Sequence, residues 1–118
     1  MLLYFYPEDD TPGCTKEAQA FRDALNKFIH QNIVVLGVSS DSVSSHKRFA
    51  AKYHLPFTLL ADEAKNIIKD YGAQGILCRT KRVSYLLNPQ GKIAKVYPQV
   101  RPDRHAAQIL RDFTQLTK

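Results

Sequence analysis

The sequence has few cysteines, no long apolar run and no internal repeat, and each shortage narrows what the chain can be. Its two cysteines, Cys14 and Cys78, are too few for a disulfide scaffold, and 118 residues can bury a core without one. No apolar stretch approaches the roughly 20 residues that cross a bilayer. The apolar start, residues 1–6, lacks the basic region and the small-residue cleavage site of a signal peptide. We therefore expect a cytoplasmic protein with free thiols and no membrane partner.

Acidic residues are also scarce, since 11 Asp and Glu stand against 17 Lys and Arg and leave a formal charge of +6. The basic residues are spread along the chain, and their densest cluster, residues 79–82, is short and flanked by apolar residues. This distribution favours a solvated basic surface over a nucleic-acid-binding face. The four histidines, His30, His46, His54 and His105, have no metal-ligand spacing, and we expect each of them to lie at the surface.

Apolar periodicity divides the chain into alternating strands and helices. Short apolar runs predict strands over residues 1–6, 33–38, 57–60, 82–87 and 93–97, the last two joined by a turn at residues 88–91. Helices are predicted from Thr11 and Pro12, after residues 40–42, over residues 64–71 and from Pro102 and Asp103. The positions expected to face inward include Ala18, Phe21, Leu25, Phe28 and Ile29 in the first helix and Val43, Phe49, Ala50 and Tyr53 in the second.

The order of these elements is β-α-β-α, then a short strand and helix, then β-β-α. Strands that alternate with helices indicate a parallel sheet, and the closing hairpin adds an antiparallel strand. We predict one α/β domain over residues 1–118 with a thioredoxin-like (glutaredoxin-type) core, in which helices flank a central mixed sheet of about four or five strands. In this architecture the first helix begins where the first strand ends, and here its opening turn carries Cys14.

Cys14 lies where a helix favours negative charge. With Thr11 as the cap and Pro12 as the first helical residue, Cys14 is the third, beside unpaired amides and the positive end of the helix dipole. A free thiol has a pKa of about 8.5, and such a position stabilises the reactive thiolate. The alternative is that Cys14 serves only as a small buried apolar side chain. The polar loop before it favours a reactive cysteine instead. A Cys-x-x-Cys motif is absent, since positions 11 and 17 are Thr and Glu, which argues against a dithiol oxidoreductase.

The segment around Cys14 also matches a known signature. Pro7, Thr11 and Cys14 form the pattern Pro-x-x-x-Thr-x-x-Cys. The segment resembles the peroxiredoxins, and in particular their bacterioferritin comigratory protein or peroxiredoxin Q subfamily. The resemblance covers essentially the whole chain and is carried by residues 4–18, 35–41, 57–62 and 82–93.

The resemblance implies a thiol peroxidase that reduces hydrogen peroxide and alkyl hydroperoxides. Cys14 is then the peroxidatic cysteine, whose thiolate attacks the peroxide and becomes a sulfenic acid. Thr11 hydrogen-bonds the peroxide, and Pro7 shields the thiolate from water. Arg82 matches the family's active-site arginine, and its forked donors suit a thiolate and peroxide oxygens; taken alone, it is equally typical of a surface cation at a strand end. The resemblance implies thioredoxin or a similar thiol as the reductant and no metal or organic cofactor.

The chain departs from the family pattern in its second cysteine. Many members carry a resolving cysteine five residues after the first, where this chain has Gln19, and others carry it in the next helix, where residues 49–50 stand here. Cys78 remains, four residues before Arg82. One hypothesis is that Cys78 resolves the Cys14 sulfenic acid as a disulfide after local unwinding. The alternative is that Cys78 is an incidental loop thiol and that an external thiol resolves Cys14.

The second departure is the start of the chain. Family members begin with an additional hairpin and helix, which we expect this chain to lack, with apolar surface exposed as a result. A monomer and a homodimer both remain open. The competing hypothesis is an inactive, truncated thioredoxin-fold module that senses redox state or binds partners, and a holdase-like or nucleic-acid-binding oligomer has little support. The intact set of Pro7, Thr11, Cys14 and Arg82 favours the enzyme.

Overall fold

The five predicted strands form one mixed sheet with the order β3-β2-β1-β4-β5. The computed structural model describes the backbone of residues 1–116 and, within that range, every side chain except those of Cys78 and Leu116. Strands β1, β2 and β3 are parallel, whereas β4 runs antiparallel to both β1 and β5. The strands are β1 (Leu2–Phe5), β2 (Val35–Ser39), β3 (Thr58–Ala61), β4 (Val83–Leu87) and β5 (Ile93–Tyr97).

Strand β1 lies in the centre of the sheet, and its side chains alternate between two cores. Leu2, Tyr4 and the following Tyr6 belong to one core, whereas Leu3 and Phe5 belong to the other. All five side chains are buried. Because both faces of the sheet are covered at β1, this strand is a continuous apolar run rather than an alternation of apolar and polar residues.

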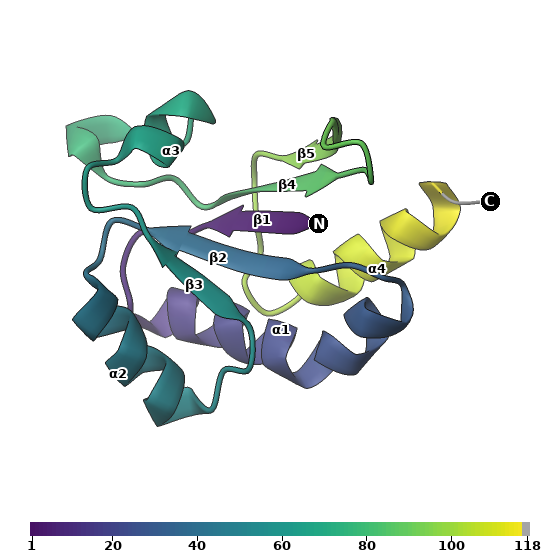
Figure 1. Cartoon of the computed structure of the whole chain (residues 1–118), viewed down its shortest axis with the longest axis horizontal. Helices are drawn as coiled ribbons and strands as arrows, with labels where there is room; N and C mark the ends of the chain where they lie inside the picture. Colours follow the sequence, from purple (N-terminus) through teal and green to yellow (C-terminus); the bar gives the residue numbers. More distant parts are fainter. Residues whose placement is uncertain (117–118) are drawn as a thin grey trace.

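Helices cover both faces of the sheet (Figure 1). The larger core lies between the sheet and three helices, and it includes Phe21, Phe28, Phe49 and Ile109 from them. The smaller core lies on the other face, where Ile68 packs against Leu3 and Phe5. No helix within residues 1–116 has the length and apolar character needed to cross a membrane. The helices of the larger core are α1 (Pro12–His30), α2 (Val43–Tyr53) and α4 (His105–Leu116), and the other face carries α3 (Asn66–Asp70) and the 3₁₀ turn η1 (Ile76–Cys78).

Four predictions about helix faces are wrong. Ile29 and Val43, expected to face inward, are both 58% exposed. His46 and His105, expected at the surface, are buried. Each of these histidines lies on the inward face of its helix, and both nitrogens of each ring have a hydrogen-bond partner, which is the condition for burying a polar side chain. The surface prediction is confirmed for the other two histidines, His30 and His54.

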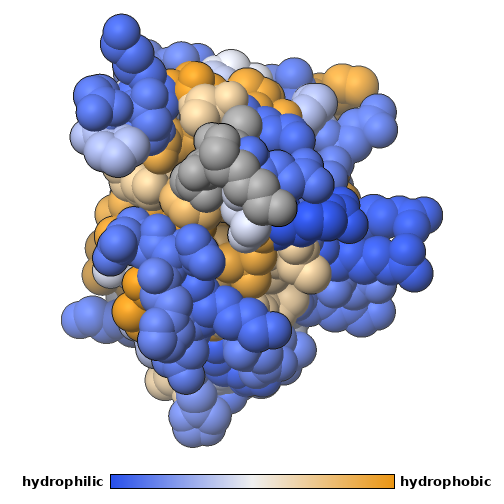
Figure 2. Space-filling view, turned by 90° about the vertical axis from the view of Figure 1, so that its right-hand side faces the viewer, coloured by the Kyte–Doolittle hydropathy of each residue, from blue (hydrophilic) through white to orange (hydrophobic). Residues whose placement is uncertain are grey.

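The end of the sheet at which β1 begins carries exposed apolar side chains. Met1 is 40% and Val34 is 60% exposed, and the two lie close together because the amide of Leu2 donates to the carbonyl of Val34 at 2.7 Å. Figure 2 views the molecule from this side and shows apolar surface between hydrophilic residues. The predicted functional residues lie at the opposite end, where β1 leads into α1.

Candidate active site

The register of the sheet brings Arg82 to the loop that follows β1. Phe5, the last residue of β1, pairs with Val83, the first residue of β4. Arg82 therefore lies beside the loop of residues 6–11, which ends at Thr11, the N-cap of α1. This arrangement brings Cys14 and Arg82 together although 68 positions separate them in the sequence.

Cys14 is the third residue of α1, as predicted, and it contacts a cation directly. Its Sγ accepts a hydrogen bond from Nη2 of Arg82 at 3.3 Å. Cys14 is 2% exposed and packs within the larger core. The alternative of a buried apolar cysteine thus accounts for its burial but not for its charged neighbour. A guanidinium here places a permanent positive charge and a hydrogen-bond donor beside the sulfur.

Arg82 also binds Glu17, which the sequence motif does not single out. Nη1 of Arg82 donates to Oε1 of Glu17 at 2.9 Å. Burial raises the pKa of Glu17 to about 7, although the charge of Arg82 and its hydrogen bond act in the opposite direction. Among the described residues, Oε2 of Glu17 has no hydrogen-bond partner. A signal for this residue exists in the sequence, because Glu17 falls on the apolar face of α1 together with Cys14 and Phe21.

Gly13 leaves room for the guanidinium of Arg82. A Cβ atom at this position would lie 3.0 Å from Nη2 and 3.6 Å from Cζ of Arg82. Such a contact is tighter than ordinary van der Waals packing, so any side chain here would push the guanidinium away. The same Cβ would lie 3.8 Å from Cγ of Pro102, so the segment before α4 also borders the site. Gly13 is thus required for close approach rather than for an unusual backbone conformation.

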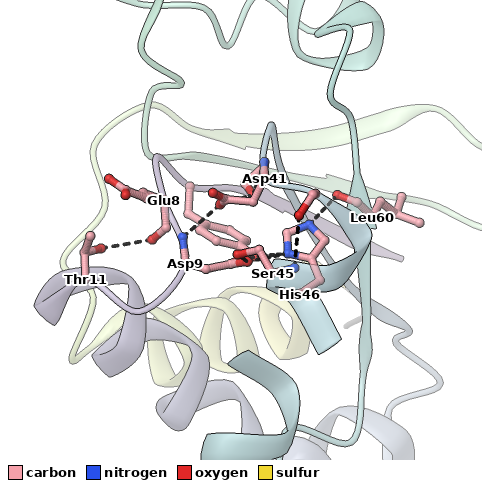
Figure 3. A network of polar contacts seen from close by, with 10 residues as sticks. Glu8, Asp9, Thr11, Asp41, Ser45, His46 and Leu60 are labelled. Atoms are coloured by element: carbon pink, nitrogen blue, oxygen red, sulfur yellow. Dashed lines mark hydrogen bonds and ion pairs between the residues drawn. The ribbon is translucent and has the colours of Figure 1, made fainter. Parts of the chain in front are cut away.

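Thr11 and Pro7 lie on the loop before α1, and both are half-buried. The Oγ1 of Thr11 donates a hydrogen bond to the carbonyl oxygen of Glu8 at 3.0 Å (Figure 3), and it does not cap the amides of α1. Of the four predicted active-site residues, the described contacts join Cys14 and Arg82 directly, whereas the loop conformation alone places Thr11 and Pro7.

Cys78 ends the turn η1 at the tip of the loop of residues 73–81. The loop is closed by a bridge between Gln74 and Thr80 and by a hydrogen bond of 2.6 Å from the amide of Lys81 to the carbonyl of Ala73. The side chain of Cys78 lies outside the part of the chain whose side chains the structure describes. Its predicted resolving role therefore rests on the sequence.

A second group of polar residues holds the loop before α1 (Figure 3). The Asp9 carboxylate accepts hydrogen bonds from the hydroxyl of Tyr6 at 2.6 Å, the hydroxyl of Ser45 at 2.7 Å and Nδ1 of His46 at 2.7 Å. Nε2 of His46 donates to the carbonyl oxygen of Leu60 at 3.1 Å. A carboxylate and a carbonyl oxygen both accept hydrogen bonds, so a protonated imidazole ring satisfies both contacts of His46.

The titration of this group follows from its contacts. Burial opposes the charge on each partner, but the hydrogen bond and the charge of Asp9 outweigh it and raise the pKa of His46. The hydrogen bonds from His46, Tyr6 and Ser45 likewise outweigh burial and lower the pKa of Asp9. Asp9, Asp41 and His46 hold possible ligand atoms within 4.8 Å of one another. In this structure the three side chains are bonded to one another and to neighbouring groups, and they form a hydrogen-bond network that holds the loop.

The mixed sheet, with the buried Cys14 at the start of α1 bonded to Arg82, defines a thioredoxin-like thiol protein. Residues 1–96 match the AhpC/TSA family, and the chain belongs to it. A relative from Coxiella burnetii named as a peroxiredoxin bcp is 43% identical over 117 residues, which cover 93% of this chain and 78% of that protein. The chloroplastic peroxiredoxin Q of Arabidopsis thaliana is 45% identical, over 93% of this chain and 52% of the relative.

Solved structures agree with these relatives and confirm the predicted fold class. The bacterioferritin comigratory protein of Xanthomonas campestris, studied for its alkyl peroxide reduction activity, superimposes with a TM-score of 0.94 at 31% identity. The match covers 99% of this chain and 79% of that protein. A peroxiredoxin Q structure from Xylella fastidiosa also gives a TM-score of 0.94, at 33% identity, over 99% of this chain and 77% of the other. The predicted resemblance to the peroxiredoxin Q subfamily is thereby confirmed.

Proposed function

We propose that this protein is a thiol peroxidase that reduces hydrogen peroxide and alkyl hydroperoxides, with Cys14 as the attacking residue. The observation that carries this proposal is the hydrogen bond of 3.3 Å from Nη2 of Arg82 to Sγ of Cys14 at the start of a helix. A permanent cation and a helix N-terminus together favour the thiolate, which is the reactive form of a cysteine. The family membership supports the same chemistry.

The reaction begins when the Cys14 thiolate attacks one oxygen of the peroxide. A sulfur–oxygen bond forms, the oxygen–oxygen bond breaks, and the sulfur becomes a sulfenic acid. The departing alkoxide or hydroxide takes up a proton and leaves as an alcohol or as water. Arg82 stabilises the thiolate before attack and the negative charge on the departing oxygen during it. Thr11 donates a hydrogen bond to the bound peroxide after its hydroxyl leaves the Glu8 carbonyl, and Pro7 limits the access of water.

The sulfenic acid must be reduced before a second turnover. We propose that thioredoxin or a similar thiol supplies the electrons, either directly or through a disulfide between Cys14 and Cys78. Local unwinding is required for the disulfide, because the side chain of Cys14 in the first turn of α1 is buried. A reducing compartment such as the cytoplasm suits this cycle, and neither a cofactor, a nucleic acid nor a membrane takes part in it.

Mass spectrometry of the two cysteines tests this proposal. Reduced protein mixed with one equivalent of hydrogen peroxide is expected to gain one oxygen at Cys14, or to form a Cys14–Cys78 link. The Cys14→Ser variant is expected to leave the peroxide unconsumed. Peptide mapping after oxidation separates the two recovery routes, and the absence of a link within or between chains removes the role of Cys78. Equal peroxide consumption by the wild type and Cys14→Ser would contradict the peroxidase proposal and favour the alternative, an inactive thioredoxin-fold module.

A further inference from the structure

The buried pair of Asp9 and His46 touches neither Cys14 nor Arg82 in any contact described above, yet it lies within the loop that carries two proposed active-site residues. We propose that Asp9 and His46 are positioning residues, whose ion pair fixes the loop of residues 7–11 and thereby sets Pro7 and Thr11 over Cys14. This inference rests on the proposed peroxidase function. It assigns a role to residues outside the Pro-x-x-x-Thr-x-x-Cys signature.

The pair is nearly closed to solvent and fully bonded. The side chains of His46 and Asp9 are 6% and 4% exposed, and their charged atoms are 2.7 Å apart. Both carboxylate oxygens of Asp9 are occupied, one by Tyr6 and the other by Ser45 and His46. A buried ion pair offsets the loss of hydration only when its remaining polar atoms are satisfied, and this one meets that condition.

The network holds the backbone of the loop as well as one side chain. The amide of Asp9 donates to Oδ2 of Asp41 at 2.8 Å, and the hydroxyl of Ser39 donates to the same oxygen at 2.7 Å. Asp9 is therefore held through its amide by the end of β2 and through its carboxylate by α2. Pro7 and Thr11 each lie two residues from this fixed point, so neither can shift far while the pair is intact.

The residue after Asp9 shows that the loop needs such support. Asp10 has a φ of 59°, a left-handed conformation that costs a residue with a Cβ about 1 kcal/mol or more. Restraints on both sides of Asp10 can hold the chain in this conformation in spite of the cost. The contact from Asp9 to α2 supplies that restraint on one side, and the start of α1 supplies it on the other.

Asp10 also provides a matched control on the same loop. Its carboxylate binds Nζ of Lys52 at 2.8 Å and the hydroxyl of Tyr53 at 2.6 Å, so it too joins the loop to α2. The side chains of Lys52 and Asp10 are 59% and 43% exposed. Exposed ion pairs contribute little because water and salt screen them. Loss of the Asp10 contact should therefore leave the loop in place, whereas loss of the Asp9 contact should release it.

The test compares two reactions of Cys14 in the 118-residue chain. Hydrogen peroxide needs the loop residues in position, whereas iodoacetamide needs only an accessible thiolate. In Asp9→Asn and His46→Gln we expect the rate constant with hydrogen peroxide to fall about tenfold or more, because small misplacements of positioning groups are costly. The rate constant with iodoacetamide should stay within about twofold of the wild type, or rise. Asp10→Asn should change neither rate constant by more than about twofold.

Ser45→Ala keeps the test decisive if the charge variants fold poorly. It removes one hydrogen bond to Asp9 and leaves the ion pair, so a fall of about threefold in the peroxide rate alone is expected. Equal falls in both reactions, or no fall in the peroxide rate of folded variants, would overturn the positioning role. A wild type that reacts with peroxide no faster than free cysteine would instead overturn the proposed function, whatever the variants do.

Discussion

Two ion pairs with buried carboxylates flank the start of α1, and they differ in how completely their atoms are bonded. Both carboxylate oxygens of Asp9 have partners, and the pKa of Asp9 is lowered by hydrogen bonds in spite of its burial. Glu17 binds Arg82 through one oxygen only, and its burial raises the pKa of Glu17 to about 7. A fully bonded pair acts as a fixed anchor, whereas a half-bonded pair can change its charge near neutral pH. The half-bonded pair of Glu17 and Arg82 is the one that contacts Cys14, because Arg82 also bonds its sulfur.

The largest effect is expected when the cation beside the sulfur is removed. Arg82→Gln keeps a polar side chain but loses the charge that stabilises the thiolate and the departing oxygen. We expect the rate constant for oxidation of Cys14 by hydrogen peroxide to fall by about 100-fold or more. Quenched-flow mixing followed by mass spectrometry of the Cys14 peptide measures this rate constant.

Arg82→Lys is the control for charge alone. Lysine has one ammonium group and cannot bond Glu17 and Cys14 with the fixed geometry of a fork. We expect a rate constant between those of the wild type and Arg82→Gln. A rate constant for Arg82→Gln within about twofold of the wild type would show that the charge of Arg82 has no part in the attack.

The next prediction compares how much the carboxylates of Asp9 and Glu17 each contribute to the free energy of unfolding. At pH 7 Asp9 is ionised, so Asp9→Asn removes a real charge and leaves His46 buried without its partner. We expect the free energy of unfolding to fall by about 3 kcal/mol or more. Glu17 is close to half-protonated at that pH and its ionised form is disfavoured by burial, so for Glu17→Gln we expect no loss, or a gain of up to about 2 kcal/mol. Urea unfolding at pH 7 measures both, and equal losses would contradict the contrast.

The pH dependence of Glu17→Gln follows from the same reasoning. The folded state holds the proton of Glu17 up to a pKa of about 7, whereas the unfolded state releases it near 4.5. Between these values the folded state binds more protons, so the wild type loses stability as the pH rises. The stability of Glu17→Gln relative to the wild type should therefore increase from about pH 5 to about pH 8, by up to about 3 kcal/mol. A pH-independent difference would show that Glu17 is ionised throughout.

The smallest effect is expected from a methyl group beside the guanidinium. In Gly13→Ala the new Cβ would lie 3.0 Å from Nη2 of Arg82 and displace it by a few tenths of an ångström. We expect the peroxide rate constant to fall by about fivefold. Stability should hold or rise by about 0.5 kcal/mol, because alanine favours the helix more than glycine does. Unfolding and oxidation measured on one preparation check this split, and parallel losses in both would point to general disruption instead.

The sequence was sufficient for most of the fold. The central strand was recognisable because burial on both faces makes it a continuous apolar run, and the start of α1 because Thr11 and Pro12 have strong positional preferences. The helix faces were harder to predict. His46 and His105 were misplaced because their burial depends on partners elsewhere in the chain, such as Asp9 and Ser84, which helical periodicity does not contain.

The site was predicted where the motif is local and missed where it depends on packing. Cys14 was singled out by its place at the start of a predicted helix and Arg82 by resemblance, and the sheet register explains why they meet. Glu17 was overlooked as a carboxylate on an apolar helix face, although that misfit is itself a signal for a buried partner. The close approach of Gly13 to Arg82 joins two segments that are far apart in the sequence, so no sequence pattern predicts it.

The most direct test of the account is the rate constant of Cys14 with hydrogen peroxide, compared with that of free cysteine at the same pH. The contact between Arg82 and Cys14 predicts a reaction faster by several orders of magnitude in the wild type, since the protein supplies both the thiolate and a preorganised charge for the departing oxygen. A wild-type rate constant equal to that of free cysteine would contradict the account, because the arrangement of Cys14, Arg82 and Glu17 would then have no chemical consequence.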